Sequence, residues 1–177
     1  MIKNVLFSLG ATPLHKKSTK KLKISEIENK FNFKLPNELR ELYSLFTSSV
    51  IFESGAKIKP NQAAPFADNE GYQSIEILYG IDNENNNILQ KNVMYEELQQ
   101  KGYFIFGASC GGDQLCLGKN DLKVYCWDHE SSENEQEFYE ISTNLSSFFN
   151  ALKADEDEQP AKIDDTNSFL SFLVHQT

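Results

Sequence analysis

Apolar and polar positions alternate most clearly over residues 103–129, YFIFGASCGGDQLCLGKNDLKVYCWDH. Tyr103 to Ser109 is rich in β-branched and aromatic residues, and Asp113 to Gly118 and Leu122 to Trp127 are each of strand length. The intervening Gly111-Gly112 and Lys119-Asn120-Asp121 carry the residues that turns require. The pattern therefore predicts three consecutive antiparallel strands.

Helical spacing dominates before this meander. Ser25 is expected to cap a helix in which Glu28 completes a capping box. Leu35-Pro36 then begins a second helix, with the proline in the first turn, where its missing amide costs nothing. The buried stripe of this second helix follows three- and four-residue spacing and consists of Leu39, Leu42, Tyr43 and Phe46.

Between these helices and the meander, residues 53–73 are rich in Pro, Gly, Ala and Asn and predict a long surface connection. Ser74 to Gly80 alternates as a strand does, and Ile88 to Gln100 has helical spacing, with Gly102 as its stop. For the N-terminus, Val5 to Leu9 fits either an edge strand or a short helix. The lysine-rich segment after Pro13 predicts an exposed connection.

After the meander, Phe138 to Ile141 predicts a last short strand. Thr143 or Asn144 can cap a Phe- and Leu-rich helix over Leu145 to Leu152. We therefore divide the chain into a basic N-terminal segment at residues 1–23, a domain at residues 24–152, and an acidic linker with an extra helix at residues 153–177.

Length and composition agree with this division. The 177 residues are enough to bury a core, and thirteen Phe, seven Tyr and one Trp supply large apolar side chains for it. The apolar run near the N-terminus is broken by Gly10 and Pro13, which makes it too short for a signal peptide or a membrane span. We expect a cytoplasmic protein with no membrane partner.

The formal net charge of -9 is unevenly distributed. Residues 1–23 carry six lysines and no acid, whereas residues 128–165 carry twelve acids against Lys153 and Lys162, a net charge of -10. Such a field repels nucleic acid and attracts a cationic protein. For any single carboxylate, however, the simpler explanation is that it keeps the surface solvated.

The three cysteines, Cys110, Cys116 and Cys126, all lie in the meander and form no Cys-x-x-Cys pair. This favours buried free thiols in a reducing compartment. Cys126 and His129 could begin a zinc site, but no second pair in the sequence completes a tetrahedron, so we expect no metal.

The sequence also contains no phosphate loop or zinc-protease motif. Cys110 is the one tempting nucleophile, but a buried thiol beside a turn is the commoner arrangement. Gly111-Gly112-Asp113 is expected to be a tight or bulged turn, since an acid directly follows the glycines. We therefore expect no catalytic residues and no cofactor, although an enzyme with a site assembled from scattered residues stays an alternative.

The best candidate for partner recognition is the acidic stretch that begins at Trp127, because an aromatic side chain ringed by carboxylates suits a hot spot that faces a basic surface. The alternative is a half-buried tryptophan that ends a strand before a solvated loop. The candidate residues are Tyr125, Trp127, Asp128, His129, Glu130, Glu133 and Glu135, with Asp68 and Glu70 in the long connection as weaker ones.

Three segments, in this order, resemble the SUKH superfamily of Smi/Knr-like domains. They are IENKFNFKLPNELRELYSLF with its Leu35-Pro36 turn, FIFGASCGGDQLCL with its Gly-Gly-Asp turn, and YEISTNLSSFFNAL with its closing strand and helix. The chain departs from the family at Thr47-Ser48-Ser49, where Asn-Gly is often found.

The resemblance implies an α+β fold, with a mainly antiparallel sheet of five to six strands flanked by helices, that acts by binding other proteins. Many bacterial relatives resemble immunity proteins encoded beside polymorphic toxins, often nucleases, and fungal relatives resemble regulators of cell-wall synthesis. We expect a non-catalytic immunity protein that occludes a cognate basic toxin. The alternative is a regulatory interaction module related to the cell-wall regulators. Fold alone does not decide between these roles.

Overall fold

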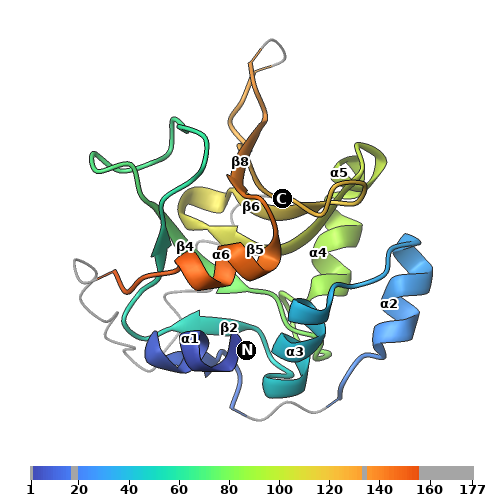
Figure 1. Ribbon diagram of the computed structural model, residues 1–177. Coiled ribbons are helices and arrows are strands. Elements are labelled where there is room, and N and C mark those ends of the chain that lie inside the picture. Colours follow the sequence, from blue (N-terminus) through green and yellow to red (C-terminus); the bar gives the residue numbers. More distant parts are fainter. Residues whose placement is uncertain (1, 17–19, 133–134, 156–177) are drawn as a thin grey trace.

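Figure 1 shows the computed structural model, which describes residues 2–16, 20–132 and 135–155. The fold is α+β, as predicted. The helices are α1 (Ile2–Ser8), α2 (Ile24–Phe31), α3 (Asn37–Leu45), α4 (Ile88–Met94), α5 (Glu96–Gln100) and α6 (Leu145–Ala151). The strands are β1 (Ala11–Pro13), β2 (Val50–Phe52), β3 (Lys57–Ile58), β4 (Gln73–Leu78), β5 (Tyr103–Ser109), β6 (Gln114–Gly118), β7 (Val124–Trp127) and β8 (Phe138–Ser142). The extra helix expected near the C-terminus lies outside the described residues.

The strands form one sheet in the order β1-β2-β4-β5-β6-β7-β8, with β3 paired to β4 beside this path. Each pair of neighbouring strands is antiparallel. The predicted meander is confirmed as β5, β6 and β7. With eight strands in the described residues, however, the sheet is larger than the five to six predicted. The additional strands β1, β2 and β3 have only two or three residues each, too few to show the alternation that marks a strand.

The N-terminal residues belong to the same core. The segment at Val5, for which a strand and a helix were both open, is the helix α1, and its Ile2 and Leu6 are buried. β1 then pairs with β2, with Ala11 opposite Phe52. Residues 2–13 therefore add a helix and an edge strand to the sheet.

Glu28 organises the connection between α2 and α3, which is not the role predicted for it. Helix α2 begins at Ile24, after Lys23 as N-cap and without a side-chain cap, so the capping box with Ser25 is wrong. Glu28 instead lies one turn into the helix, where it is 6% exposed. Its carboxylate accepts the N–H of Leu35 at 2.8 Å. Lys34 lies 3.2 Å from the same carboxylate, and Arg40 also pairs with it.

The single helix predicted over residues 88–100 is divided at Tyr95 into α4 and α5. Asn92 of α4 explains how this unit is attached to the sheet. Its side-chain amide donates to the Ile105 carbonyl, and its oxygen accepts the Ile105 N–H, both at 2.8 Å. Because β4 pairs with β5 only from Gly107 onward, Asn92 replaces the missing strand partner at Ile105.

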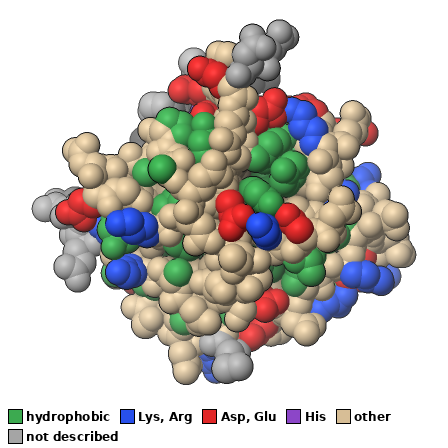
Figure 2. All heavy atoms as spheres, turned by 45° about the horizontal axis from the view of Figure 1, so that its top comes forward, with side chains coloured by type: hydrophobic (Ala, Val, Ile, Leu, Met, Phe, Trp, Pro, Cys, Tyr) green, Lys and Arg blue, Asp and Glu red, His purple; other side chains and the backbone are tan. Residues whose placement is uncertain are grey.

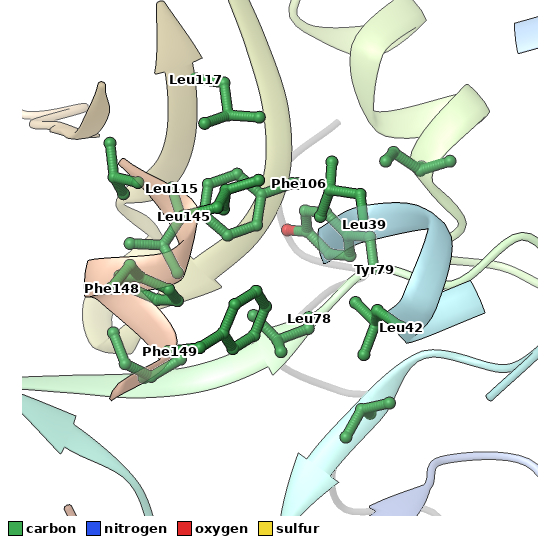
Figure 3. Close-up of a cluster of buried hydrophobic side chains, with 14 of the residues drawn as sticks. Leu39, Leu42, Leu78, Tyr79, Phe106, Leu115, Leu117, Leu145, Phe148 and Phe149 are labelled. Carbon is green, nitrogen blue, oxygen red and sulfur yellow. The ribbon is translucent and has the colours of Figure 1, made fainter. Parts of the chain in front are cut away.

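Side chains from β4, β5 and β6 meet α3 and α6 in the cluster shown in Figure 3. Phe106 of β5 contacts Phe148 of α6 edge-to-face, with ring centroids 5.6 Å apart. The predicted cap of α6 is confirmed, since the Asn144 side chain accepts the N–H of Ser147 at 2.8 Å. Among the helices of the described ranges, none is long and apolar enough to cross a membrane.

Candidate functional site

The register of β6 and β7 brings two distant acidic positions together. Gln114 pairs with Trp127, so the residues just beyond the strand ends, Asp113 and Asp128, lie next to each other. Asp113 is only 5% exposed. Its Oδ1 lies 2.8 Å from Nδ1 of His129 and accepts the backbone N–H of His129 at 3.2 Å. The Asp113–His129 contact therefore fastens the turn before β6 to the chain that leaves β7.

The glycines before Asp113 form the turn that the sequence predicts. Cys110–Gly112 is a short 3-10 turn in which Gly111 and Gly112 have φ values of 86° and 104°, a conformation that favours glycine. A Cβ atom on Gly112 would lie 3.4 Å from Cε1 of His129. This is an ordinary van der Waals distance, so the positive φ, not a lack of space, favours glycine at this position.

Short-range hydrogen bonds hold the carboxylates of the β7–β8 connection. Asp128 Oδ1 accepts the N–H of Glu130 at 3.0 Å, and Glu135 Oε2 accepts the N–H of Ser132 at 2.9 Å. The Asp128 N–H donates to the carbonyl of Glu137 at 2.8 Å, which continues the strand pairing one step beyond β7. Asp128 thus continues the sheet, whereas the Glu135 hydrogen bond lies within the connection itself.

The long connection between β3 and β4 supplies an aromatic wall. The N–H of Gln62 donates to the carbonyl of Glu140 at 3.0 Å, so this connection lies along the outer edge of β8. Phe66 then contacts Tyr139 of β8 edge-to-face, with ring centroids 5.3 Å apart. These contacts cover an edge strand that would otherwise present unpaired backbone groups.

Residues of the β7–β8 connection and of the aromatic wall line an open groove of about 610 Å³. Figure 2, in which the top of Figure 1 comes forward, shows acidic side chains beside hydrophobic ones on this face, with lysine or arginine side chains among them. The lining includes Asp113, Asp128, His129, Glu130 and Glu135, which we call the carboxylate wall, and Pro65, Phe66 and Tyr139, which belong to the aromatic wall. We call this feature the acidic groove.

The acidic groove brings together Asp128, His129, Glu130 and Glu135 of the residues proposed from sequence. Glu133 lies outside the described residues. Asp113, proposed only as a turn residue, joins the same wall. The sequence analysis missed Phe66 and Tyr139, because nothing in a single sequence shows that the long connection returns to β8. Counting outward from the turn at Lys119-Asn120-Asp121 would have placed Asp113 opposite Trp127, one residue out of register, because the connection also includes Leu122 and Gln114 pairs with Trp127.

Tyr125 and Trp127 lie on one face of β7, as strand alternation predicts, and both are half-buried. Trp127 contacts Tyr95 of the α4–α5 junction edge-to-face, with centroids 5.6 Å apart. Tyr125 contacts Tyr103 in the same manner at 5.4 Å. These two residues pack against neighbouring aromatic rings, and neither lines the acidic groove.

Asp68 and Glu70 are exposed in the long connection. Asp68 has a local structural task, because its Oδ1 accepts the N–H groups of Glu70 and Tyr72, each at 2.8 Å. The hydrogen bond from Tyr72 is the main cause of a lowered pKa at Asp68, and the bond from Glu70 adds to it. Asp68 therefore shapes the turn that precedes β4.

The cysteines divide into two kinds. Cys116 and Cys126 are buried as predicted, and burial raises the pKa of both thiols, which makes them poor nucleophiles. The expectation that Cys110 is buried is wrong, because it is exposed at the turn and lines the acidic groove. Cys110 is exposed because it lies in the turn directly after Ser109, the last residue of β5.

The zinc pairing of Cys126 with His129 was disfavoured from sequence, and Cys126 contacts a different residue. Its sulfur lies 2.8 Å from the side-chain nitrogen of Gln73. The structure instead gathers potential ligand atoms of Asp113, Asp128 and His129 within 4.8 Å of one another. Asp113 and His129 already form a hydrogen bond with each other. The closeness of these atoms by itself is therefore no evidence of a metal site.

Two comparisons with known proteins agree with this architecture. The model of the SMI1 / KNR4 family (SUKH-1) matches residues 19–151. The SPbeta prophage-derived uncharacterized protein YokK of Bacillus subtilis (strain 168) is 22% identical over 151 residues, which cover 80% of this chain and 78% of YokK. Because the family match spans more than half of the chain and covers the three motifs that resemble SUKH domains up to Ala151, the protein belongs to the SMI1 / KNR4 family (SUKH-1).

Proposed function

We propose that this protein is a non-catalytic immunity protein that binds a cognate protein toxin of basic charge and neutralises it by occlusion. The observation that carries this proposal is the acidic groove. Its described lining contains four carboxylate residues and no lysine or arginine. Membership of the family and a relative described as prophage-derived support the same assignment.

Electrostatics gives the groove a physical role in such a complex. A concave surface of one charge sign concentrates field lines and steers an oppositely charged protein toward it. If the toxin acts on nucleic acid, its active site must be basic to hold phosphates, and carboxylates can occupy that site in their place. Asp128 and Glu135 suit this task because their backbone hydrogen bonds reduce the ordering cost of binding.

Co-expression tests the proposal. The product of the adjacent reading frame is expressed alone, with the wild-type protein, or with the double variant Asp128→Asn/Glu135→Gln. In this variant an amide oxygen still accepts the N–H groups of Glu130 and Ser132. The matched control, Glu96→Gln/Glu97→Gln, removes the same charge from exposed positions on α5. We expect growth to be rescued by the wild type and the control, and less by the groove variant.

The outcome also separates the two roles considered from sequence. Rescue of growth together with one tight partner in a pull-down supports an immunity protein. A neighbouring product that is harmless, together with several weak partners, supports a regulatory interaction module and overturns the proposal.

A further inference from the structure

We infer that the acidic groove recognises an arginine side chain of the partner, inserted between its carboxylate wall and its aromatic wall. This inference rests on the proposed function for the identity of the partner, but it concerns a property of the groove that can be measured without the partner. It goes beyond charge attraction because it assigns a separate task to each wall.

The carboxylate wall supplies acceptors that are held in place. Asp128 and Glu135 each accept a backbone N–H on one oxygen, and among the described residues no lysine, arginine or histidine forms an ion pair with either carboxylate, so the other oxygen can accept from a donor in the groove. Asp113 is occupied by His129 and serves as a support behind this wall. Carboxylates that line one groove suit the planar, forked donors of a guanidinium group better than the compact ammonium of lysine.

The aromatic wall supplies the second half of the recognition. Phe66 and Tyr139 both line the groove and hold each other edge-to-face with an interplanar angle of 87°. A guanidinium group stacks on aromatic faces while its edges donate hydrogen bonds, and it is more weakly hydrated than an ammonium group. Between these two walls an arginine can use its flat face and its edge at once.

The charge and the volume of the acidic groove agree with a single arginine side chain as its occupant. In the part of the chain that the structure describes, no lysine or arginine lines the groove, so its carboxylates have no cation of their own chain inside it. The groove volume of about 610 Å³ exceeds that of one side chain and leaves room for the flanking backbone of the partner. The occupant is thus an arginine carried on a projecting loop or strand.

The test uses peptides as probes with the full-length, isotope-labelled protein. Acetyl-Gly-Arg-Gly-amide is titrated while backbone amide resonances are followed, and the matched lysine and citrulline peptides are titrated in the same way. We expect saturable shifts at the amides of residues 110–113, 128–130 and 135–139. The affinity for the arginine peptide should be about threefold or more above that for the lysine peptide, and the citrulline peptide should give no saturable shift.

Two variants test the separate tasks of the carboxylate wall and the aromatic wall. Asp128→Asn/Glu135→Gln should weaken arginine binding about tenfold, whereas the control Glu96→Gln/Glu97→Gln should leave it unchanged. Tyr139→Leu keeps an apolar side chain, and it should abolish the preference for arginine over lysine while retaining weak binding of both. An unchanged amide spectrum away from the groove shows that each variant is folded.

Shifts spread over the whole surface, or none at the groove, would overturn the inference. Equal affinity for the lysine peptide in the wild type would overturn the part assigned to the aromatic wall. Neither result bears on growth rescue by co-expression, so failure of this inference and failure of the proposed function are separately visible.

Discussion

The Nδ1 atom of His129 lies 2.8 Å from the Oδ1 atom of Asp113, and this contact joins two connections that are far apart in sequence. Asp113 ends the turn before β6, and His129 lies two residues beyond the end of β7. Since the same oxygen also accepts the backbone N–H of His129, both the ring and the main chain are positioned. The acidic wall of the groove is therefore built on a buried acceptor.

Replacing Asp113 by alanine should lower the free energy of unfolding by about 1–3 kcal/mol, because the substitution removes a buried acceptor from two donors. Asp113→Asn should cost less, since its side-chain oxygen can still accept the His129 N–H. Urea denaturation of the two variants measures the difference. Equal destabilisation by both substitutions would show that the charge of Asp113, not its acceptor geometry, holds the turn.

Glu28 should make the protein sensitive to acid. Burial by itself raises the pKa of Glu28, but hydrogen bonds from Leu35 and Lys34 and the charge of Arg40 outweigh it, so the pKa lies below its usual value of 4.5. A carboxyl group with a lowered pKa in the folded state stabilises the fold fully above its unfolded pKa, and this contribution is lost as the pH falls through the folded pKa.

We therefore expect the free energy of unfolding to decrease below a pH of about 4.5. Glu28→Gln should be less stable than the wild type at neutral pH and should show a smaller loss on acidification. The control is Glu26→Gln, which breaks only an exposed ion pair with Lys23 and should leave the pH profile unchanged. A profile for Glu28→Gln parallel to that of the wild type would contradict this assignment.

The sequence predicted those elements whose signals are local. The meander of β5 to β7 has alternation and turn residues within it, and α6 has its cap at Asn144 directly before the helix. The capping box predicted from Ser25 and Glu28 was wrong, because Glu28 instead accepts the N–H of Leu35. Here a tertiary contact overrides a local preference.

The groove could be predicted only in part. Asp128, His129, Glu130 and Glu135 are close in sequence and were proposed as one surface. The aromatic wall depends on hydrogen bonds between Gln62 and Glu140, residues that only the fold brings together. Trp127 was proposed for partner recognition because carboxylates surround it in the sequence. Its contact with Tyr95 depends on the α4–α5 junction, and the helical pattern did not reveal that the helix is divided there.

Asn92 should be one of the more costly polar residues to remove. Its side chain satisfies both backbone groups of Ile105 and also donates to the carbonyl of Ile88, while being fully buried. Asn92→Ala should lower the free energy of unfolding by about 3 kcal/mol, because it leaves buried donors and acceptors without partners. The neighbouring exposed Gln90→Ala, measured by the same urea titration, should change stability little.

If Asn92→Ala were as stable as Gln90→Ala, then the bond between α4 and β5 would contribute little, and packing alone would hold α4. Amide hydrogen exchange gives a second measurement. The N–H of Ile105 should exchange faster in Asn92→Ala than in the wild type, because its acceptor, the side-chain oxygen of Asn92, is lost.

Two glycines should respond differently to alanine. At Gly80 a Cβ atom would lie 2.3 Å from backbone atoms of Ser48 and Ser49, so the main chain must move, and we expect a loss of about 3 kcal/mol or more. At Gly111 the space is open and only the positive φ of 86° opposes a side chain, at a cost of about 1–2 kcal/mol. Thermal unfolding of both variants should rank Gly80→Ala well below Gly111→Ala, and the reverse order would contradict this account.

Association with a basic partner should slow markedly as salt rises, because the carboxylates of the groove act through a field that mobile ions screen. Stopped-flow measurements between about 50 and 500 mM salt test this. The association rate should decline more steeply with salt for the wild type than for Asp128→Asn/Glu135→Gln.

The control Glu96→Gln/Glu97→Gln carries the same net charge as the groove variant. Its salt dependence should stay nearer that of the wild type, since its charges are removed from α5. Equal slopes for the two double variants would mean that net charge, not the groove, steers the partner, and a rate indifferent to salt would remove electrostatic steering altogether.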